Sequence, residues 1–418
     1  MINKLKPKSE FSSNVLILMT GTTIAQAIPI AISPILTRLY TPEDFGVFAL
    51  YLSIMGILFP VVTGRYELAI LLPKKDTNAL QIMYASAIIT LAVFLLSIFG
   101  ILFFHQNIVE MLNNKDISKW LYLVPFSVLL YGFFQIFNYW FNRNKLYKEL
   151  AKNKVIQSIA VALVNIVGYY ATHSVFGLIV GNIFGFFVVN IRFFYIFFAN
   201  KNFTININKK QIQMLLRKYK KFPIYNMPNA LIDQFRMNGI NILIISYFSN
   251  ALLGQFYMAF RMLQAPMGLV GTSLSQVFVQ KIASSKKIDV YNIVYKFIIK
   301  SILLVAPVFF LLYFYVADIF VFIFGEKWDI AGKIASLLVP WVFVNFVSSP
   351  ISNVFIVLHH QEKMLIFSIL YALTPLLIIY LTHIDFLLTI QYISWSMTIL
   401  LILFISLALY LSKKEINK

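Results

Sequence analysis

Charged side chains inside two long apolar runs near mid-chain are the residues best suited to chemistry. Asp233 and Arg236 lie near the middle of the first run, three positions apart, and therefore share one face of a helix. Arg261 lies in the second run, beyond the polar turn at residues 249–251. With a rise of about 1.5 Å per residue, the two guanidinium groups would lie within roughly 5 Å of the same depth. Guanidinium groups bind phosphates through paired hydrogen bonds, so this spacing predicts a cationic site for an anion.

Each of these charges also has an alternative interpretation. An arginine near the centre of a bilayer costs about 3 kcal/mol, so it should face protein or water, and two of them predict a positively charged cavity. Arg236 could instead pair with Asp233 inside a helix bundle, whereas no acid lies near Arg261 in the second run. A carboxylate at mid-depth is suited to exchanging a proton or a sodium ion. Asp233 is therefore a candidate for ion coupling, with the pairing to Arg236 as its alternative.

A second charged pair, Arg65 and Glu67, lies in the sequence GRYELAI toward the inner end of another apolar run. Arg65 could meet an anionic ligand at a cytoplasmic entrance, and Glu67 could act as a gate or an ion-coupling acid. A structural contact between the two side chains is an equally good interpretation.

Side-chain amides give two of the apolar runs a polar face. Gln26 lies in the first run of the chain and Gln234 in the run that carries Asp233. These amides could bind the hydroxyl groups of a sugar, or they could hydrogen-bond between helices. Further amides in the same part of the chain are Asn226, Asn229, Asn238 and Asn241.

The composition identifies an integral membrane protein. Of the 418 residues, 60% are hydrophobic and only 12% are charged, about half the charged fraction of soluble domains. The absence of cysteine excludes disulfides, thiolate metal sites and thiol nucleophiles. The pair His359-His360 is a poor metal site, because adjacent side chains point apart on a helix and no acidic partner is near. The sequence therefore predicts neither a metal nor a cofactor, and it contains no phosphate-binding loop for ATP.

The apolar runs predict an all-α protein with about twelve transmembrane helices. Prolines within or at the ends of several runs predict bent helices. The predicted spans are residues 12–37, 44–72, 79–104, 118–142, 153–172, 175–199, 222–248, 251–281, 290–324, 332–358, 363–382 and 386–412.

The basic residues predict the orientation of the spans. Most of the 35 lysines and arginines flank span ends on one side, including the residues before the first span and after the last. This places both termini in the cytoplasm by the positive-inside rule. Most of the net charge of +19 then reflects topology, and nucleic-acid binding is not expected. The basic residues on the other side are Arg38, Lys115, Lys119, Lys327 and Lys333.

The two halves of the chain are related by an internal repeat. A shift of 208 residues aligns Gln26 with Gln234 and Gly46 with Gly254. The repeat predicts two parallel six-helix bundles around a central cavity, with a binding site between the lobes. The predicted domains are an N-terminal lobe at 1–200, a cytoplasmic linker with an amphipathic helix at 201–221, and a C-terminal lobe at 222–418.

Three stretches resemble a known family. They are SPILTRLYTPEDFGVFAL with TGRYELAILLPK, then KFPIYNMPNAL with GQFYMAFRMLQAPMGLVGTSLSQVF, and FGEKWDIAGKIASLLVPW with SSPISN. In this order and spacing they resemble the polysaccharide transporter family of bacterial lipid-linked oligosaccharide flippases. That family lies within the multidrug/oligosaccharidyl-lipid/polysaccharide exporter superfamily, here MOP.

The resemblance implies a cargo and a location. The cargo would be an oligosaccharide on undecaprenyl pyrophosphate, moved from the cytoplasmic to the outer leaflet of a bacterial inner membrane for O-antigen, lipopolysaccharide or another surface polysaccharide. Its pyrophosphate would be bound by Arg236, Arg261 and Arg65, and its sugars by Gln26 and Gln234. The protein would act as a monomer with membrane lipids around it, beside a polymerase and glycosyltransferases, and could couple to H⁺ or Na⁺.

Two other functions compete with this prediction. A multidrug cation antiporter of the same superfamily should have a cavity that attracts cations, which the arginines disfavour. A membrane polymerase or ligase should have a large outer loop bearing catalytic groups. The longest predicted outer loop, around residues 105–117, is short and contains one histidine, so an enzyme is not expected.

Overall fold

The computed structural model describes residues 10–199, 207–266, 287–358, 360–382 and 385–414, together with residues 275, 278, 282 and 285. All secondary structure in these ranges is helical. Nine of the described helices are long and apolar enough to cross a membrane. The other three predicted spans correspond to shorter or more polar helices, α2, α9 and α10. The prediction of an all-α membrane protein is therefore confirmed.

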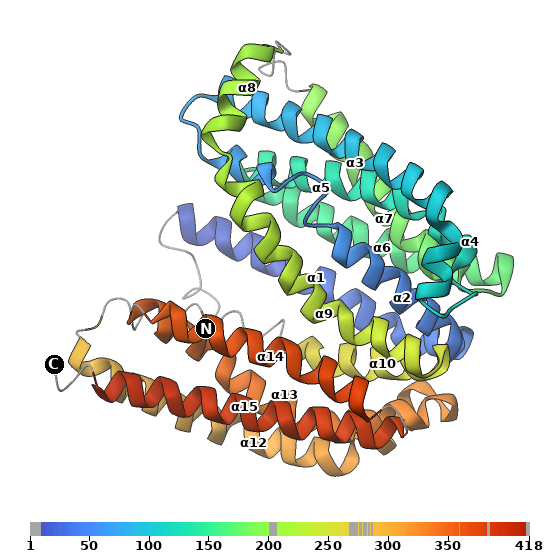
Figure 1. The fold of residues 1–418 in the computed structure, drawn as a ribbon, viewed down its shortest axis with the longest axis vertical. Helices are drawn as coiled ribbons and strands as arrows, with labels where there is room; N and C mark the ends of the chain where they lie inside the picture. Colours follow the sequence, from blue (N-terminus) through green and yellow to red (C-terminus); the bar gives the residue numbers. More distant parts are fainter. Residues whose placement is uncertain are drawn as a thin grey trace. The chain divides into compact units, whose positions relative to one another are not determined.

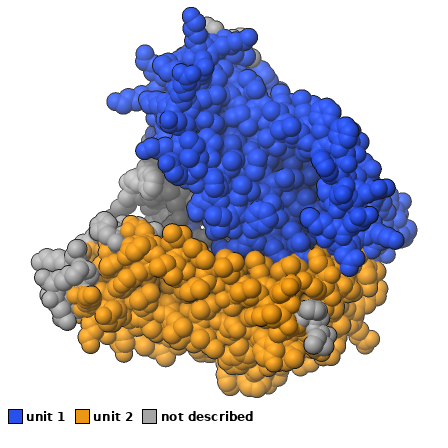
Figure 2. Space-filling view, viewed as in Figure 1, with its two compact units in different colours: residues 1–40, 47–242 blue, residues 41–46, 243–418 orange. Residues whose placement is uncertain are grey.

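The chain divides into two compact units, shown in different colours in Figure 2. The first unit contains residues 1–40 and 47–242, and the second contains residues 41–46 and 243–418. The segment 41–46 thus belongs to a different unit from the residues on either side of it.

The first unit is a bundle of long helices (Figure 1). α6 packs along both α1 and α7, and α5 packs along both α3 and α7. Glycines on α7 allow the α6 contact, since a Cβ atom at Gly181 would lie 2.1 Å from Asn165 Oδ1. The described helices are α1 (Glu10–Leu39), α2 (Pro42–Leu58), η2 (Tyr66–Leu71), α3 (Asp76–Met111), α4 (Ser118–Leu121), α5 (Val124–Arg143), α6 (Tyr147–Thr172), α7 (Phe176–Ala199), α8 (Lys209–Lys218), η3 (Phe222–Asn226) and α9 (Met227–Tyr247).

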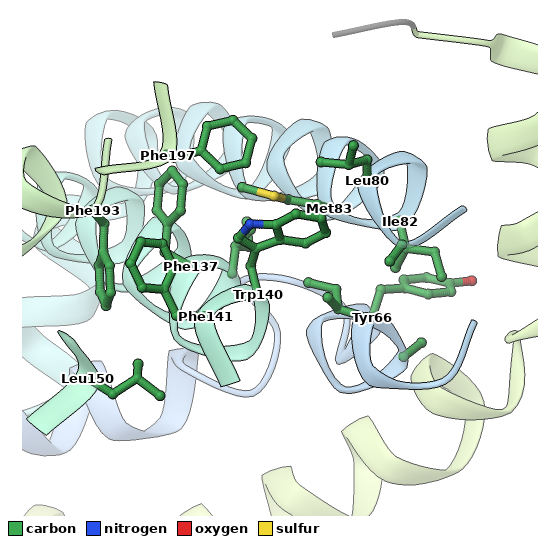
Figure 3. Packing of buried hydrophobic residues seen from close by; sticks show 14 of the residues in the cluster. Tyr66, Leu80, Ile82, Met83, Phe137, Trp140, Phe141, Leu150, Phe193 and Phe197 are labelled. Atoms are coloured by element: carbon green, nitrogen blue, oxygen red, sulfur yellow. The ribbon is translucent and has the colours of Figure 1, made fainter. Parts of the chain in front are cut away.

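Aromatic rings from α5 and α7 dominate one core of this unit. Phe137 and Phe193 stack with ring centroids 5.7 Å apart, and Trp140 is fully buried beside them. Figure 3 shows these rings together, with Tyr66 of η2 at the edge of the cluster and its hydroxyl group directed away from it. The core therefore holds the η2 segment as well as the long helices.

The second unit is built around α12, α13 and α15. Its core joins the inner faces of these helices, and Phe404 of α15 stacks on both Phe355 of α13 and Phe367 of α14. The described helices are α10 (Asn250–Pro266), α12 (Lys287–Phe324), η5 (Glu326–Trp328), α13 (Asp329–Val357), α14 (Gln361–Leu381) and α15 (Phe386–Lys414).

The internal repeat is visible where α2 and α10 begin. Thr41 accepts a hydrogen bond from the backbone N–H of Asp44 (3.2 Å), and Ser249, its equivalent after a shift of 208 residues, accepts one from Leu252 (3.2 Å). Both are N-caps, which satisfy backbone donors of the first turn.

The two helices also contact each other symmetrically within the second unit. A Cβ atom at Gly46 would lie 1.9 Å from the backbone oxygen of Asn250, and one at Gly254 would lie 1.8 Å from that of Pro42. Under the same shift, Gly46 corresponds to Gly254 and Pro42 to Asn250. The two contacts are therefore equivalent under the shift, as a repeat between the two halves predicts.

The predicted continuous span at 44–72 is wrong. α2 ends at Leu58, residues 59–65 form turns, and a short 3₁₀ helix follows. Pro60 removes a backbone donor that a continuing helix would need. Gly64 and Arg65 both have positive φ angles, 57° and 62°, which a right-handed helix does not contain. The apolar composition of the run concealed this break.

The division between the compact units falls after Ile242, beyond the linker predicted at 201–221. The physical reason is that α9 packs on α2. The amide of Asn241 donates to Ser53 Oγ (2.9 Å), and a Cβ atom at Gly56 would lie 2.6 Å from Asn238 Nδ2. These contacts join most of α9 to the first unit.

Candidate functional site

The break after α2 carries a buried ion pair. Arg65 Nη1 lies 3.6 Å from Glu67 Oε1, and the Glu67 side chain is only 2% exposed. The Thr63 hydroxyl donates a hydrogen bond to the other carboxylate oxygen of Glu67. Left-handed backbone at Gly64 and Arg65 turns the chain so that these three side chains meet. The structural contact predicted as one alternative for Arg65 and Glu67 is therefore present.

Arg65 keeps part of its hydrogen-bonding capacity. Its side chain is 28% exposed, and its Nε atom is buried without a hydrogen-bond partner in the described part of the chain. Five N–H donors make up a guanidinium group, and one carboxylate cannot satisfy them all. Arg65 can therefore hold Glu67 and still present donors to another anion.

Helix α5 fixes this segment from one side. Arg143 donates to the backbone oxygen of Ile70 (3.1 Å) and forms an ion pair with Asp76 (2.8 Å). Nearer the start of α5, Tyr131 stacks on Phe59, the first residue after α2, with ring centroids 3.5 Å apart. The segment is thus held at both of its ends.

The amphipathic helix α8 fixes the same segment from another side. The Tyr66 hydroxyl donates to the backbone oxygen of Leu216 (3.1 Å), and Leu215 is buried in the core that contains Tyr66. The Gln211 amide donates to Asn78 on α3 (2.5 Å). The segment with the Arg65–Glu67 pair is therefore linked to α8, in the basic stretch that connects the two halves of the sequence.

Asp233 and Arg236 form the predicted i,i+3 pair on α9. Arg236 Nη2 lies 3.7 Å from Asp233 Oδ1, with side chains 31% and 59% exposed. The separation is long for a charge-assisted hydrogen bond, so the pair is loose. Asp233, the more exposed of the two, thus keeps access to another partner.

Arg261 has aromatic rather than acidic surroundings. Its Nη1 donates to the Tyr257 hydroxyl one turn earlier on α10 (3.3 Å), and its guanidinium carbon lies 5.8 Å from the centre of that ring. No carboxylate of the described residues forms an ion pair with it. Arg261 belongs to the second unit and Arg236 to the first, and each is described within its own unit.

The two glutamines differ in their surroundings. Gln234 is half-buried and accepts a hydrogen bond from Asn238 Nδ2 at its side-chain oxygen (2.9 Å), within α9. Gln26 is exposed on α1. Among the amides considered for sugar binding, Asn241 donates to Ser53 on α2, as the alternative of hydrogen bonding between helices predicts. Asn238 donates to Gln234 within α9.

One cation was missed as a site residue. Lys154 is predicted as a cytoplasmic flank, yet α6 begins earlier, at Tyr147, so Lys154 lies two turns inside the helix. Its ammonium group donates to Thr22 on α1 (3.0 Å), and no carboxylate within the described ranges pairs with it. Thr22 lies one turn before Gln26 on α1. A mid-helix lysine just past a polar turn was the available sequence signal.

The described residues contain no cluster of ligands suited to a metal ion. The prediction that no acidic partner lies near the histidine pair is wrong for His360, which contacts Glu362 (3.2 Å) because the turn before α14 places the two side chains together. His359 lies outside the described residues. The candidate residues of the two units are therefore cations, two carboxylates and amides, which can bind anions and polar groups.

The comparisons with known proteins agree on family and fold. The sequence profile of the polysaccharide biosynthesis protein family matches residues 35–333. A comparison with curated protein sequences found no significant match. Among solved structures, the lipid II flippase MurJ in an inward closed conformation matches with a TM-score of 0.73 at 14% identity, over 96% of this chain and 90% of that chain.

Other transporters match over nearly the same length. An inward-facing multidrug resistance MATE transporter of the MOP superfamily has a TM-score of 0.61 at 13% identity, covering 97% of this chain and 94% of its own. A MOP transporter from Pyrococcus furiosus, described as having a binding pocket of reverse polarity, has a TM-score of 0.59 at 12% identity, with coverages of 97% and 95%. The predicted resemblance is confirmed: the chain belongs to the polysaccharide biosynthesis protein family and has the fold of multi-pass MOP transporters.

Proposed function

We propose that the protein is a flippase that moves undecaprenyl-pyrophosphate-linked oligosaccharide from the cytoplasmic to the outer leaflet. The observation that carries this proposal is the combination of a polysaccharide biosynthesis family with a membrane transporter fold. The family indicates that the cargo contains sugars, and the fold indicates that this cargo is transported across the membrane. The similarity to a lipid II flippase supports a lipid-linked form of the cargo.

The charges of the described helices suit such a cargo. A lipid pyrophosphate carries several negative charges, and arginine binds it through paired hydrogen bonds. Arg261 contacts no carboxylate of the described residues, and Arg65 keeps a buried donor without a partner in the described part of the chain. Arg236 lies 3.7 Å from Asp233, with its side chain 31% exposed. These three arginines bind the pyrophosphate, and Gln26 and Gln234 bind the sugar hydroxyls.

The cavity opens alternately to each side as the lobes at 1–200 and 222–418 rock about the linker 201–221. Asp233 couples this movement to H⁺ or Na⁺, because it is the more exposed of the two candidate carboxylates at 59%. Glu67 acts as the gate of the cytoplasmic entrance, since its ion pair ties the break after α2 together.

The protein works in the inner membrane of a bacterium with both termini in the cytoplasm. The excess of lysine and arginine on one side of the spans supports this orientation. It acts as a monomer, beside the polymerase and the glycosyltransferases that make a surface polysaccharide such as the O-antigen of lipopolysaccharide.

Transport in proteoliposomes tests the proposal. Fluorescent undecaprenyl-pyrophosphate oligosaccharide is followed across the bilayer with the native chain, Arg261→Ala and Arg236→Ala at matched insertion levels. Each variant should slow transport by about tenfold or more, because each removes charge-assisted hydrogen bonds to the cargo. Arg38→Ala is the matched control, since Arg38 is exposed at the end of α1 and should leave the rate unchanged.

Two results would contradict the proposal at different levels. Normal transport by both variants would show that these arginines are structural and that the pyrophosphate binds elsewhere. If the native chain transports none of several lipid-linked oligosaccharides under any ion gradient, the flippase assignment itself is wrong.

Two other functions are less well supported. The MATE-like fold is compatible with a multidrug cation antiporter, but Arg261, which forms no ion pair with a described carboxylate, repels cations. A polymerase or ligase would need an outer loop with catalytic groups. The connection between Met111 and Ser118 is short, so the transporter is preferred to an enzyme.

A further inference from the structure

An open pocket of about 580 Å³ lies within the second unit, among α12, α13 and α15. Its lining combines opposite charges, neutral polar groups and leucine side chains. The residues that matter here are Lys333, Ser336, Leu337, Asp385, Leu388 and Gln391.

The pocket lies close to the ends of these helices. Lys333 and Ser336 are in the first two turns of α13, and Asp385 immediately precedes α15. Ala317, on the pocket wall, is seven residues before the end of α12, roughly 10 Å along the helix axis. This depth corresponds to the head-group zone of a bilayer. In the orientation proposed above, it belongs to the outer leaflet.

The charges of the pocket are partly free to bind a ligand. Asp385 Oδ1 accepts the backbone N–H of Leu388 (2.7 Å), and its second oxygen has no partner in the described ranges. Lys333 pairs with Asp329 (2.7 Å) while its side chain stays 55% exposed. The pocket therefore offers a carboxylate oxygen to a donor and a shared ammonium group to an acceptor. A ligand with both an ammonium and a phosphate group matches this pair of charges.

An apolar stripe leads away from the pocket along α15. Leu388, Tyr392, Trp395 and Ile399 are 44–55% exposed, and their spacing of three or four residues places them on one helix face. An exposed apolar stripe beside a polar pocket at head-group depth fits an acyl chain below a lipid head group.

We propose that this pocket binds a phospholipid with a primary ammonium head group, such as phosphatidylethanolamine. Its ammonium group donates to Asp385, its phosphate contacts Lys333, and one acyl chain lies on the α15 stripe. A quaternary ammonium has no N–H to donate, and an anionic head group would be repelled by Asp385. The site therefore distinguishes lipids by their head group.

Native mass spectrometry of the full-length protein in detergent tests this inference. The protein is titrated with phosphatidylethanolamine, phosphatidylcholine and phosphatidylglycerol of identical acyl chains. We expect the ethanolamine lipid to bind about fivefold more tightly than the other two, the equivalent of one exposed charge-assisted hydrogen bond. Asp385→Asn should remove this preference while still capping α15, and Lys333→Gln should weaken both zwitterionic lipids.

Matched controls come from the short connection before α13. Glu326 and Lys327 are exposed and do not line the pocket, so Glu326→Gln and Lys327→Gln should leave the preference unchanged. Equal binding of the three lipids, or a preference that survives in Asp385→Asn, would overturn the inference. Because this experiment measures lipid binding and not transport, a negative result here would not contradict the proposed flippase function. A negative transport result would likewise not contradict the lipid site.

Discussion

The two ends of α2 are held in different ways. At its start, Thr41 caps the helix and Gly46 contacts the backbone of Asn250. At its far end, the chain leaves the helix and forms the buried ion pair of Arg65 and Glu67. The first region is stabilised by close backbone packing and the second by charge.

The internal repeat makes this difference informative. The cap and the glycine contact recur in the other half at Ser249 and Gly254. The charges do not recur, since a shift of 208 residues places Ser273 and Ser275 opposite Arg65 and Glu67. The packing positions Thr41 and Gly46 are thus duplicated, whereas the Arg65–Glu67 pair has no charged counterpart at the shifted positions.

The largest effect is expected at the glycine contact. In Gly254→Ala, the new Cβ atom would lie 1.8 Å from the backbone oxygen of Pro42 and 2.8 Å from Gly46 N. Backbone atoms cannot rotate away, so we expect a loss of about 3 kcal/mol or failure to fold. Thermal unfolding in detergent measures this, with Gly100→Ala as control, since nothing lies within 4 Å of a Cβ atom there. Equal melting temperatures for Gly254→Ala and the native chain would show that α2 and α10 can move apart at little cost in stability.

The second largest loss of stability is expected at the Arg65–Glu67 ion pair after α2. Glu67→Ala removes the partner of Arg65 and the acceptor for Thr63, and it leaves a guanidinium group that is largely buried. We expect a loss of about 3 kcal/mol in the free energy of unfolding, typical of breaking one side of a buried pair. Glu110→Ala is the control, because Glu110 is exposed at the end of α3. A small effect at Glu67 would mean that charge does not hold this segment.

The two N-caps offer a sharper test of the repeat. Thr41→Ala and Ser249→Ala should each cost about 1 kcal/mol, because each removes one acceptor from a helix N-terminus. Chemical denaturation of the purified protein measures both. Ser97→Ala, whose hydroxyl donates to Phe94 within α3, is the control. Strongly unequal losses would indicate that the two capped turns are alike in shape but not in energetic role.

The smallest effect is expected at the loose pair on α9. Asp233→Asn should change the free energy of unfolding by about 0.5 kcal/mol or less, because the pair is 3.7 Å apart and Asp233 is 59% exposed. Stability is again read from denaturation, and the transport assay is repeated with and without a proton gradient. Loss of the gradient dependence at unchanged stability would support ion coupling. A large loss of stability would instead make the pair structural, like that of Arg65 and Glu67.

Hydropathy predicted the long helices well because each crosses an apolar layer whose thickness sets its length. The predicted span at 175–199 corresponds to α7 (Phe176–Ala199), and the turn before α10 lies where Ser249 and Asn250 stand. The break after Leu58 was not predicted, since its residues are as apolar as a helix. Pro60 and Gly64 were its local signals.

The site was predicted less completely than the helices. The Arg65–Glu67 and Asp233–Arg236 contacts follow from short sequence spacing and could be proposed in advance. The hydrogen bond of Tyr66 to Leu216 joins residues 150 positions apart, and no single sequence contains the information to pair them. Lys154 was counted with the cytoplasmic flank because the span was predicted to begin at residue 153, six residues or nearly two turns after the start of α6 at Tyr147.

The membership of residues 41–46 in the second unit has a consequence for biosynthesis. The ribosome makes this segment long before it makes α10, the helix whose backbone Gly46 contacts. Chains generally fold in the order of their synthesis, yet here an early segment must wait in the membrane for a late partner. The second unit therefore cannot be completed until both ends of the sequence have been made, and a chain truncated before α10 would leave the backbone around Gly46 without its packing partner.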